Sequence, residues 1–417
     1  MPASVTIDNQ RSSEINSARQ ELSLAREESD RLFEILLPQF LYERPIAERH
    51  RVIFYLGHLD AFDFIQICRE GVGVTSREPA LDALFQAGID PDSNHLPVDL
   101  PSDWPAVDRV RDYVRQARQA VDRYLEEAPG DAIYMALEHR LMHLETLAYM
   151  FHNFPHTTKV QQQPSTPLTG VHATPLNDDW CTVEGGEAVL GKARDGSFGW
   201  DNEYDEHRPV TPAFRMQQFK VTNGEYLRFV SDGAPLPAFW LRSGDTLHYR
   251  GMFESVPLPL DWPVYVTLRE AQAYAAWLGK DLPSEQQFHR AAFGTHSPCS
   301  RQYPWGNSPP NPNLGNFDFK RWDPEPVAAT PGNESAFGIR QMVGNGWEWT
   351  STKFRPFSGF AASPHYPGYS ANFFDDQHFV LKGGSPRTAA RLLRRSFRNW
   401  FRTDYPYVYA TFRCVEN

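Results

Sequence analysis

The sequence predicts an α+β fold in two domains: a four-helix bundle over residues 1–160 and a second domain of short strands over residues 179–417. Three observations predict this fold. The first 160 residues hold long segments with few helix-breaking residues, whereas prolines, glycines and aromatic residues gather in the second half. The intervening segment 161–178 has no hydrophobic periodicity and is typical of a linker. A chain of 417 residues also exceeds the size of one ordinary hydrophobic core.

Four helices are expected in the first domain, over residues 12–37, 47–70, 104–127 and 131–154. The second carries apolar residues at helical spacing, namely Val52, Tyr55, Leu56, Leu59 and Phe62.

Two features at the ends of these segments predict where the helices begin. Ser102 or Asp103 is expected to cap the third helix, with Pro105 near its first turn, and Asp131 to cap the fourth. The segment 71–105 is rich in Asp, Pro and Gly and is predicted to be a loop.

The second domain is expected to alternate short strands with turns rich in Gly, Pro and Asn. Only a few of its segments favour helix, over residues 222–232, 267–278 and 284–293.

Composition excludes several classes of function. The net charge of −11 argues against general binding to nucleic acid or to an anionic membrane. No stretch has the length and apolarity of a membrane span, and the first 30 residues lack the apolar core of a signal peptide. The four cysteines (Cys68, Cys181, Cys299 and Cys414) are scattered, which fits reduced thiols and a cytoplasmic location.

Three histidines form the strongest candidate site. His139 and His143 lie four residues apart, which places both imidazoles on one face of the predicted helix 131–154. His58 lies in a mostly apolar helix, where an imidazole needs a partner. Three neutral nitrogens suit a divalent metal such as iron or zinc and leave other coordination positions open for substrates.

Acidic residues close to this trio in sequence are candidates to orient the histidine rings, namely Asp60, Glu138 and Glu145. His152 and His156 continue the same helix but are set aside, because they lie near its end at the linker.

Ordered motifs in the second domain resemble the formylglycine-generating-enzyme, or sulfatase-modifying factor, fold. The first is a "VTNxxY" signature in the segment 219–226. This resemblance implies a C-type-lectin-like α+β domain. The other motifs are 262–266, 275–285, 303–307, the GNGWEW segment 344–349, the KGGS segment 382–385 and Phe412-Arg413.

The first domain resembles a DinB-type metal-binding bundle, and the two domains together resemble the EgtB-like sulfoxide synthases of ergothioneine biosynthesis. In that family three histidines hold a ferrous ion, Fe2+, and they correspond to His58, His139 and His143. The resemblance implies a non-haem iron enzyme that uses O2 to attach a sulfur compound to the imidazole of hercynine, Nα-trimethylhistidine. The substrates would be small molecules, bound in a pocket between the domains.

The same resemblance suggests substrate-binding residues in the segment 396–405. Asn399 and Trp400 belong to an "RNW" segment that contacts the betaine in this family, and an aromatic face suits a quaternary ammonium. The alternative is that these aromatic residues belong to an ordinary core. Arg398, Phe401 and Met142 complete the predicted substrate-binding set.

This sequence departs from the family in three places. Members that use γ-glutamylcysteine carry an Asp and an Arg where this chain has Phe401 and Tyr405. The sulfur donor is therefore predicted to be free cysteine or another donor without the γ-glutamyl group. A Gln of some members is replaced by Met142. No Tyr-Tyr pair follows the first helix, so the proton donor is unassigned, with Tyr369, Tyr405 and Tyr407 as candidates by residue type only.

Seven basic residues and no acidic ones lie between Lys382 and Arg402. Such a run is usually a solvated face, but it could also bind a carboxylate substrate or pair with acids of the bundle. These residues are Lys382, Arg387, Arg391, Arg394, Arg395, Arg398 and Arg402.

Three alternative functions stay open. Formylglycine-generating enzymes use a cysteine pair, for which Cys299 and Cys414 are available. A selenoneine synthase, which joins hercynine to a selenosugar, would have the same architecture. A metal- or carbohydrate-binding module without turnover belongs to another class, and the intact histidine trio speaks against it.

Overall fold

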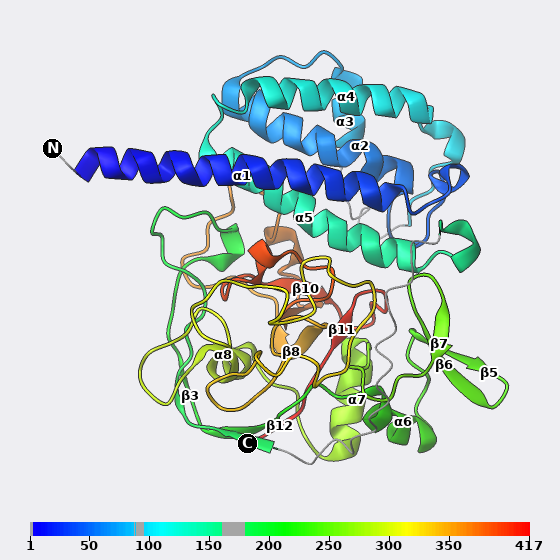
Figure 1. Cartoon of the computed structure of the whole chain (residues 1–417), viewed down its shortest axis with the longest axis vertical. Coiled ribbons are helices and arrows are strands. Elements are labelled where there is room, and N and C mark those ends of the chain that lie inside the picture. Colours follow the sequence, from blue (N-terminus) through cyan, green and yellow to red (C-terminus); the bar gives the residue numbers. More distant parts are fainter. Residues whose placement is uncertain (1–2, 87, 89–95, 161–179) are drawn as a thin grey trace. The chain divides into compact units, whose positions relative to one another are not determined.

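The computed structural model describes residues 3–86, 88, 96–160 and 180–417, and of residues 3–15 only the backbone. The chain divides into two compact units, Met1–Gln163 and Pro164–Asn417, and Figure 1 labels the elements of both. The predicted linker 161–178 lies outside the described residues. No helix among the described residues is long and apolar enough to cross a membrane. The fold is α+β, as predicted.

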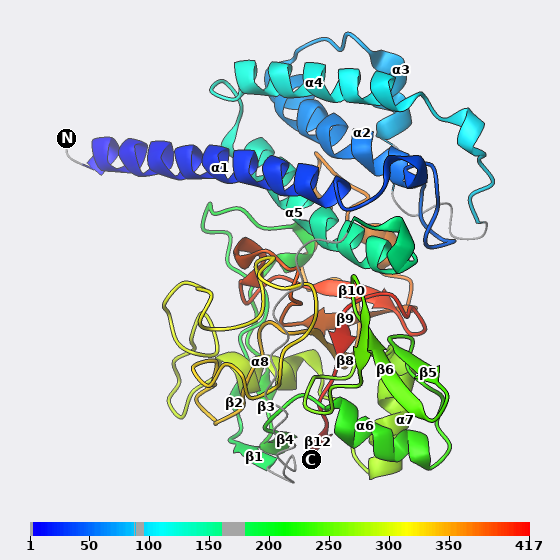
Figure 2. The same ribbon diagram turned by 45° about the vertical axis from the view of Figure 1, so that its right-hand side comes forward.

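The first unit is helical (Figure 2). Helix α1 packs along α5, and α2 packs against both α4 and α5. Short 3-10 turns lie at Pro38–Phe40, Pro101–Asp103 and His156–Thr158. The helices are α1 (Ala3–Phe33), α2 (Val52–Asp63), the π-helix η2 (Phe64–Glu70), α3 (Pro79–Phe85), α4 (Val107–Tyr124) and α5 (Gly130–His152).

The predicted N-caps of α4 and α5 were wrong. Asp103 instead closes a 3-10 turn, where its carboxylate accepts the Leu100 backbone N–H at 2.7 Å, so α4 begins only at Val107. Helix α5 begins one residue before Asp131, which therefore lies inside its first turn.

The segment predicted to be a loop contains a short helix, α3, with Pro79 in its first turn. Helix α2 does not run uniformly to Glu70 but continues as the π-helix η2. These two differences bear on the candidate site, because α3 contacts α2.

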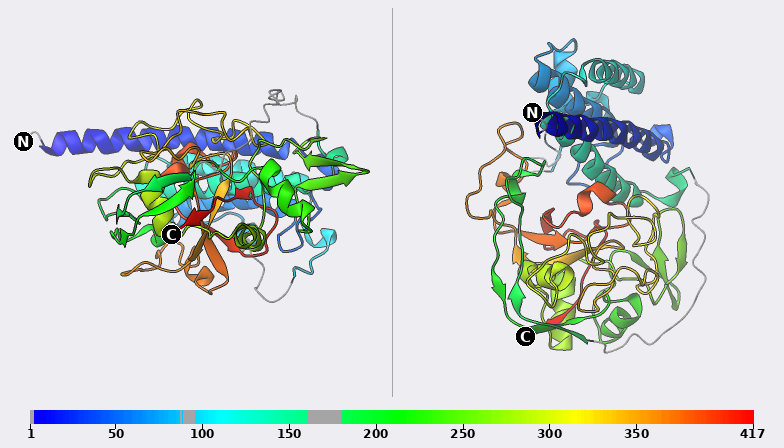
Figure 3. Two further views of the ribbon diagram at one scale, coloured as in Figure 1. Left: turned by 90° about the horizontal axis from the view of Figure 1, so that it is seen from below. Right: turned by 60° about the vertical axis from the view of Figure 1, so that its left-hand side comes forward.

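The second unit has short strands in small sheets (Figure 3). One sheet has the order β1-β4-β12, another β10-β9-β8-β11 and a third β5-β6-β7, while β2 pairs with β3. All pairs are antiparallel except β8 with β11. The strands are β1 (Trp180–Val183), β2 (Gly186–Glu187), β3 (Val210–Thr211), β4 (Phe214–Gln217), β5 (Trp240–Ser243), β6 (Thr246–Arg250), β7 (Ser255–Pro257), β8 (Trp347–Lys353), β9 (His378–Lys382), β10 (Asn399–Arg402), β11 (Ala410–Thr411) and β12 (Val415–Glu416).

The helices of this unit begin where the sequence predicts. Thr222, Thr267 and Ser284 each accept the backbone N–H of the residue three positions later, in a capping box. The helices are α6 (Asn223–Ser231), α7 (Leu268–Leu278) and α8 (Glu285–Phe293), and 3-10 turns lie at Asp201–Glu203, Ala371–Phe373 and Ala390–Leu393.

A buried ion triad joins three of the motifs. The carboxylate of Glu348 accepts from Lys220 at 2.7 Å and from Arg413 at 2.8 and 3.0 Å, and all three side chains are fully buried. Removing one partner would leave an uncompensated buried charge. The triad gives a physical reason why these three motifs, which are far apart in the sequence, occur together.

Candidate metal centre

The three predicted histidines meet inside the first unit. His58 projects from α2, and His139 and His143 project from α5. Their ligand atoms lie within 4.8 Å of one another, the one such group of metal-binding side chains in the part of the chain that the structure describes. Nε2 of His143 lies 3.2 Å from Nε2 of His58 and 3.1 Å from Nε2 of His139.

A backbone carbonyl orients one of these rings. Nδ1 of His58 lies 2.6 Å from the carbonyl oxygen of Phe85, the last residue of α3. Because a carbonyl only accepts hydrogen bonds, Nδ1 carries the proton and Nε2 presents its lone pair. Asp60, one of the three acidic residues predicted to orient the rings, pairs instead with Arg118 and Arg140. For Glu138 and Glu145 that role stays a prediction.

Aromatic rings hold two of the imidazoles in place. Phe62 stacks on His139 with ring centroids 3.5 Å apart, and Phe54 stacks on His58 at 4.8 Å. Phe54 and Phe62 lie four residues before and after His58, which puts all three on one face of α2. That spacing was a signal in the sequence that the prediction did not use.

Burial keeps the imidazoles neutral. It lowers the pKa of His58 to about 4, because the charged form would lose its hydration. Burial also lowers the pKa values of His139 and His143 well below the ordinary value, and the neighbouring histidines lower them further. Neutral imidazoles are the form that binds a metal ion.

The donor set fits a divalent transition metal. Two nitrogens about 2.1 Å from a common ion lie about 3.0 Å apart at a right angle and about 3.4 Å apart at a tetrahedral angle. The observed separations of 3.1 and 3.2 Å fall between these values. A bound cation would accept the lone pairs of all three Nε2 atoms at once. Without a cation, a hydrogen on Nε2 of His143 could be donated to His58 or to His139, but not to both.

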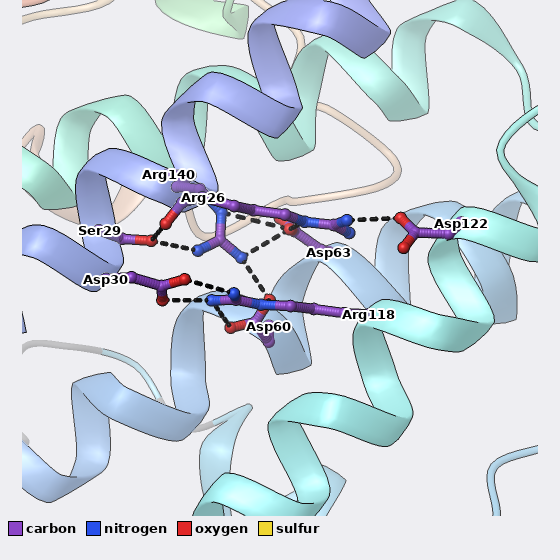
Figure 4. A network of polar contacts seen from close by, with 8 residues as sticks. All are labelled: Arg26, Ser29, Asp30, Asp60, Asp63, Arg118, Asp122 and Arg140. Carbon is purple, nitrogen blue, oxygen red and sulfur yellow. Dashed lines mark hydrogen bonds and ion pairs between the residues drawn. The ribbon is translucent and has the colours of Figure 1, made fainter.

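Arg140, which follows His139 in α5, belongs to a network of charged side chains that is buried at its centre (Figure 4). Arg140 is fully buried and donates to Asp63 at 2.6 Å, to Asp60 at 2.8 Å and to Ser29 at 3.0 Å. Arg118 joins Asp60 to Asp30, at 3.0 and 2.7 Å. The network ties α1, α2, α4 and α5 together and so fixes the histidine-bearing helices relative to one another.

The substrate-binding residues predicted in the second unit lie on or beside strand β10. Asn399, Trp400 and Phe401 pair with Leu381, Val380 and Phe379 of β9.

Trp400 is half-buried and stacks on Phe354, with ring centroids 4.2 Å apart and the planes 7° from parallel. Arg398 is buried in an ion pair with Glu285 at 2.9 Å. Met142 is a half-buried residue of α5, next to His143.

The candidate tyrosines lie in aromatic clusters. Tyr369 stacks on Trp200 at 4.0 Å and meets Trp400 edge to face at 5.4 Å. Tyr405 stacks on Phe401 at 5.2 Å and contacts Tyr407 at 5.0 Å. The proton-donor role of Tyr369 and Tyr405 stays a prediction.

Most of the basic run between Lys382 and Arg402 is matched by groups of its own unit. Arg394 donates to Glu203 at 2.8 Å, and Arg395 lies 3.6 Å from Glu206. Lys382 is buried and donates to a backbone carbonyl. Arg387 lies over the ring of Trp322 at 3.7 Å.

The cysteine alternative finds little support. All four cysteines are free thiols; Cys299 is exposed, whereas Cys414 is buried. Burial raises the pKa of the Cys414 thiol well above its ordinary value, which disfavours the thiolate that metal binding and redox chemistry need.

Comparison with known proteins defines the class of the second unit. Residues 167–417 match the model of the sulfatase-modifying factor enzyme 1-like domain. This match begins beyond the helical unit, so the DinB-type assignment of that unit stays a prediction.

Curated relatives extend the match to the helical unit. A hercynine oxygenase of Mycolicibacterium smegmatis is 32% identical, with 93% of this chain and 94% of that protein covered. A hercynine oxygenase of Mycolicibacterium thermoresistibile is 34% identical over 79% of this chain and 78% of that protein. Ergothioneine biosynthesis protein 1 of Neurospora crassa is 28% identical over 92% of this chain, which spans only 56% of that protein. The chain therefore belongs to the EgtB-like family.

Proposed function

We propose that this chain is a non-haem iron enzyme that uses O2 to form a C–S bond between hercynine and a thiol in ergothioneine biosynthesis. The observation that carries the proposal is the meeting of three buried, neutral imidazoles of His58, His139 and His143 in one group. The names of the relatives, which refer to hercynine and to ergothioneine, support the substrate and the pathway.

In this proposal the three imidazoles would hold a ferrous ion. When bound, the ion supplies the one-electron chemistry through which O2 is reduced. The chain itself holds the imidazoles in position: the Phe85 carbonyl sets the tautomer of His58, and Phe54 and Phe62 pack on the rings and keep water from those faces. Such support by the protein reduces reorganisation during the reaction.

Trp400 and Asn399 are proposed to bind hercynine. Trp400 offers an aromatic face for the trimethylammonium group, and such contacts contribute about 0.5–2 kcal/mol. We therefore expect Trp400→Leu to raise the KM for hercynine roughly 2- to 30-fold with a smaller change in kcat. Trp349→Leu is unsuitable as a control because Trp349 is fully buried, so Trp277→Leu, an exposed site on α7, is the comparison. An unchanged KM would remove Trp400 from the site.

Cysteine is the proposed sulfur donor. Phe401 and Tyr405, which stand where the γ-glutamylcysteine branch has charged residues, stack on each other in parallel at 5.2 Å. A stacked aromatic pair offers no charge to a glutamyl group. Cysteine is thus expected to support turnover with a higher kcat/KM than γ-glutamylcysteine.

The direct test is to load the protein with Fe(II) without oxygen and to measure O2 uptake with hercynine plus a panel of thiols and a selenol. Uptake that depends on hercynine, with a sulfoxide product found by mass spectrometry, would support the proposal. A selenol as the preferred donor would favour the selenoneine alternative. No uptake with any donor would favour a binding module without turnover.

Replacing a ligand tests the site itself. His139→Ala should abolish iron loading, measured by metal analysis of the purified protein, and activity with it. His152→Ala is the matched control, because His152 is also a buried histidine of α5 but lies outside the metal-binding group. Full activity of His139→Ala would contradict the assignment.

A further inference from the structure

Helix α3 makes a contact with the histidine cluster that depends on a glycine. A Cβ atom added to Gly57 would lie 2.5 Å from Cε1 and Cζ of Phe85 and 2.6 Å from Cε2. These distances are shorter than the contacts that non-bonded carbon atoms make in proteins. The edge of the Phe85 ring therefore occupies the place where every other residue at position 57 would put its side chain.

The Phe85 ring has little freedom to move aside. It is fully buried, and its centroid lies 5.5 Å from Tyr113 and 6.4 Å from Phe54. Tyr113 in turn donates from its hydroxyl to Asp82 at 2.7 Å. A side chain at position 57 would push the whole end of α3 away from α2, because close-packed interiors transmit such displacements.

That end of α3 is what orients His58. The Phe85 carbonyl belongs to the last residue of α3, and the last four carbonyls of a helix have no partner within the helix. It accepts from Nδ1 of His58 at 2.6 Å. The C-terminal end of a helix carries partial negative charge, which favours this N–H donor.

We propose that Gly57 and Phe85 form a positioning clamp: Gly57 admits the Phe85 ring against α2, and the carbonyl of Phe85 then fixes the ring and the tautomer of His58 so that Nε2 faces His139 and His143. The predicted effect of the clamp on metal binding rests on the proposed function, in which His58 is a metal ligand. The predicted effect on the tautomer of His58 does not. Partners of this kind typically change metal affinity 10- to 100-fold.

The test is a double-mutant cycle with Gly57→Ala, Phe85→Val and the combined variant. In the metal-free protein, the nitrogen NMR signals of His58, assigned with the His58→Gln variant, should show a single tautomer protonated at Nδ1. Gly57→Ala should convert this to a mixture of tautomers. Phe85→Val shortens the side chain that the new Cβ would meet, so the combined variant should return towards the wild-type spectrum.

Metal affinity is the second measurement, with Co(II) as the spectroscopic probe. Gly57→Ala should weaken Co(II) binding roughly 10- to 100-fold, and the combined variant should recover most of that loss. Gly71→Ala is the control; its Cβ would meet the Gln66 carbonyl at 3.0 Å and Pro129 at 3.2 Å, neither of which belongs to α3 or to a histidine of the cluster. It should leave Co(II) affinity within about 3-fold of wild type.

The outcomes separate this inference from the proposed function. If Gly57→Ala changes neither the tautomer of His58 nor the Co(II) affinity, the clamp is overturned even if the enzyme is active. If Gly57→Ala does not fold, the tautomer of His58 is measured in Phe85→Val instead. This variant lacks the ring that packs α3 against Gly57, so the Phe85 carbonyl should be held less firmly and the tautomers should again be mixed. A wild-type spectrum in Phe85→Val would then overturn the clamp. If the wild-type protein shows no O2-dependent turnover but Gly57→Ala still mixes the tautomers of His58, the clamp is supported and only the proposed function fails.

Discussion

Two neighbouring residues of α5, His139 and Arg140, are equally buried but stand in opposite electrostatic surroundings. Arg140 donates to two aspartates and a serine, so its charge is matched inside the protein. His139 faces two other imidazoles, and burial lowers its pKa well below the ordinary value. The comparison teaches that buried charges with partners join helices together, whereas buried neutral bases that converge on one another indicate a site for a cation.

The largest effect on stability should come from removing Arg140, whose charge is matched by partners inside the protein. Arg140→Met leaves Asp60 and Asp63 buried without their main partner, which we expect to destabilise the helical unit by about 3–5 kcal/mol. Urea unfolding followed by helical circular dichroism measures this change in the free energy of unfolding.

An exposed ion pair provides the control for Arg140→Met. Arg115 contacts Asp112 on the surface of α4, with 66% and 48% of the two side chains exposed. Arg115→Met should change the free energy of unfolding by less than about 1 kcal/mol. Equal effects of the two substitutions would show that the buried network does not hold the helices together.

The next largest effect is the pH dependence of stability that arises from the three buried histidines. The pKa of His58 falls from the ordinary 6.5 to about 4 on folding, so the unfolded chain binds the proton more tightly. The resulting stability is fully present above pH 6.5 and is lost as the pH falls towards 4. The shift corresponds to about 3 kcal/mol for His58, since each pKa unit is about 1.4 kcal/mol. The lowered pKa values of His139 and His143 act in the same direction.

Unfolding at pH 7 and pH 5, in the presence of a chelator, checks this expectation. The wild-type protein should lose stability over this interval, and His58→Gln should lose less. Identical pH dependence of the two proteins would mean that the neutral state of His58 contributes nothing to folding.

The smallest effect sharpens the contrast between the two neighbours. His143→Leu should weaken Co(II) binding at least about 100-fold, because one metal ligand is lost. Co(II) at 100 times the wild-type Kd adds about 2.7 kcal/mol to the free energy of unfolding of the wild type, and this gain should disappear in the variant. In the absence of metal the same variant should change the free energy of unfolding by less than about 1.5 kcal/mol, since it relieves contact among three neutral bases. Thermal melts with and without Co(II) measure both quantities. A large metal-free destabilisation would place His143 among the structural residues, with Arg140.

His139 and His143 were found from the sequence because a four-residue spacing places two side chains on one face of a helix. His58 was found because its helix is otherwise mostly apolar. The family of the second unit was likewise evident from its ordered motifs, and the structure shows that three residues of these motifs, Lys220, Glu348 and Arg413, meet in one buried triad. The α+β class followed from the change in composition near residue 160. The helix predicted to begin at Thr222 does begin there, and the structure shows that a capping box starts it. These features depend on local spacing, which the sequence carries directly.

Tertiary structure decided the surroundings of the site. Asp60, close to His58 in sequence, pairs with arginines of α4 and α5, whereas the Phe85 carbonyl, 27 residues away, reaches the His58 ring. No residue pattern announces a backbone carbonyl as a partner, because every residue has one. The sequence by itself determined which side chains are candidates to bind a metal and on which helices they lie. Only packing decided which atoms orient them, since hydrogen bonds across helices depend on how the helices approach in space.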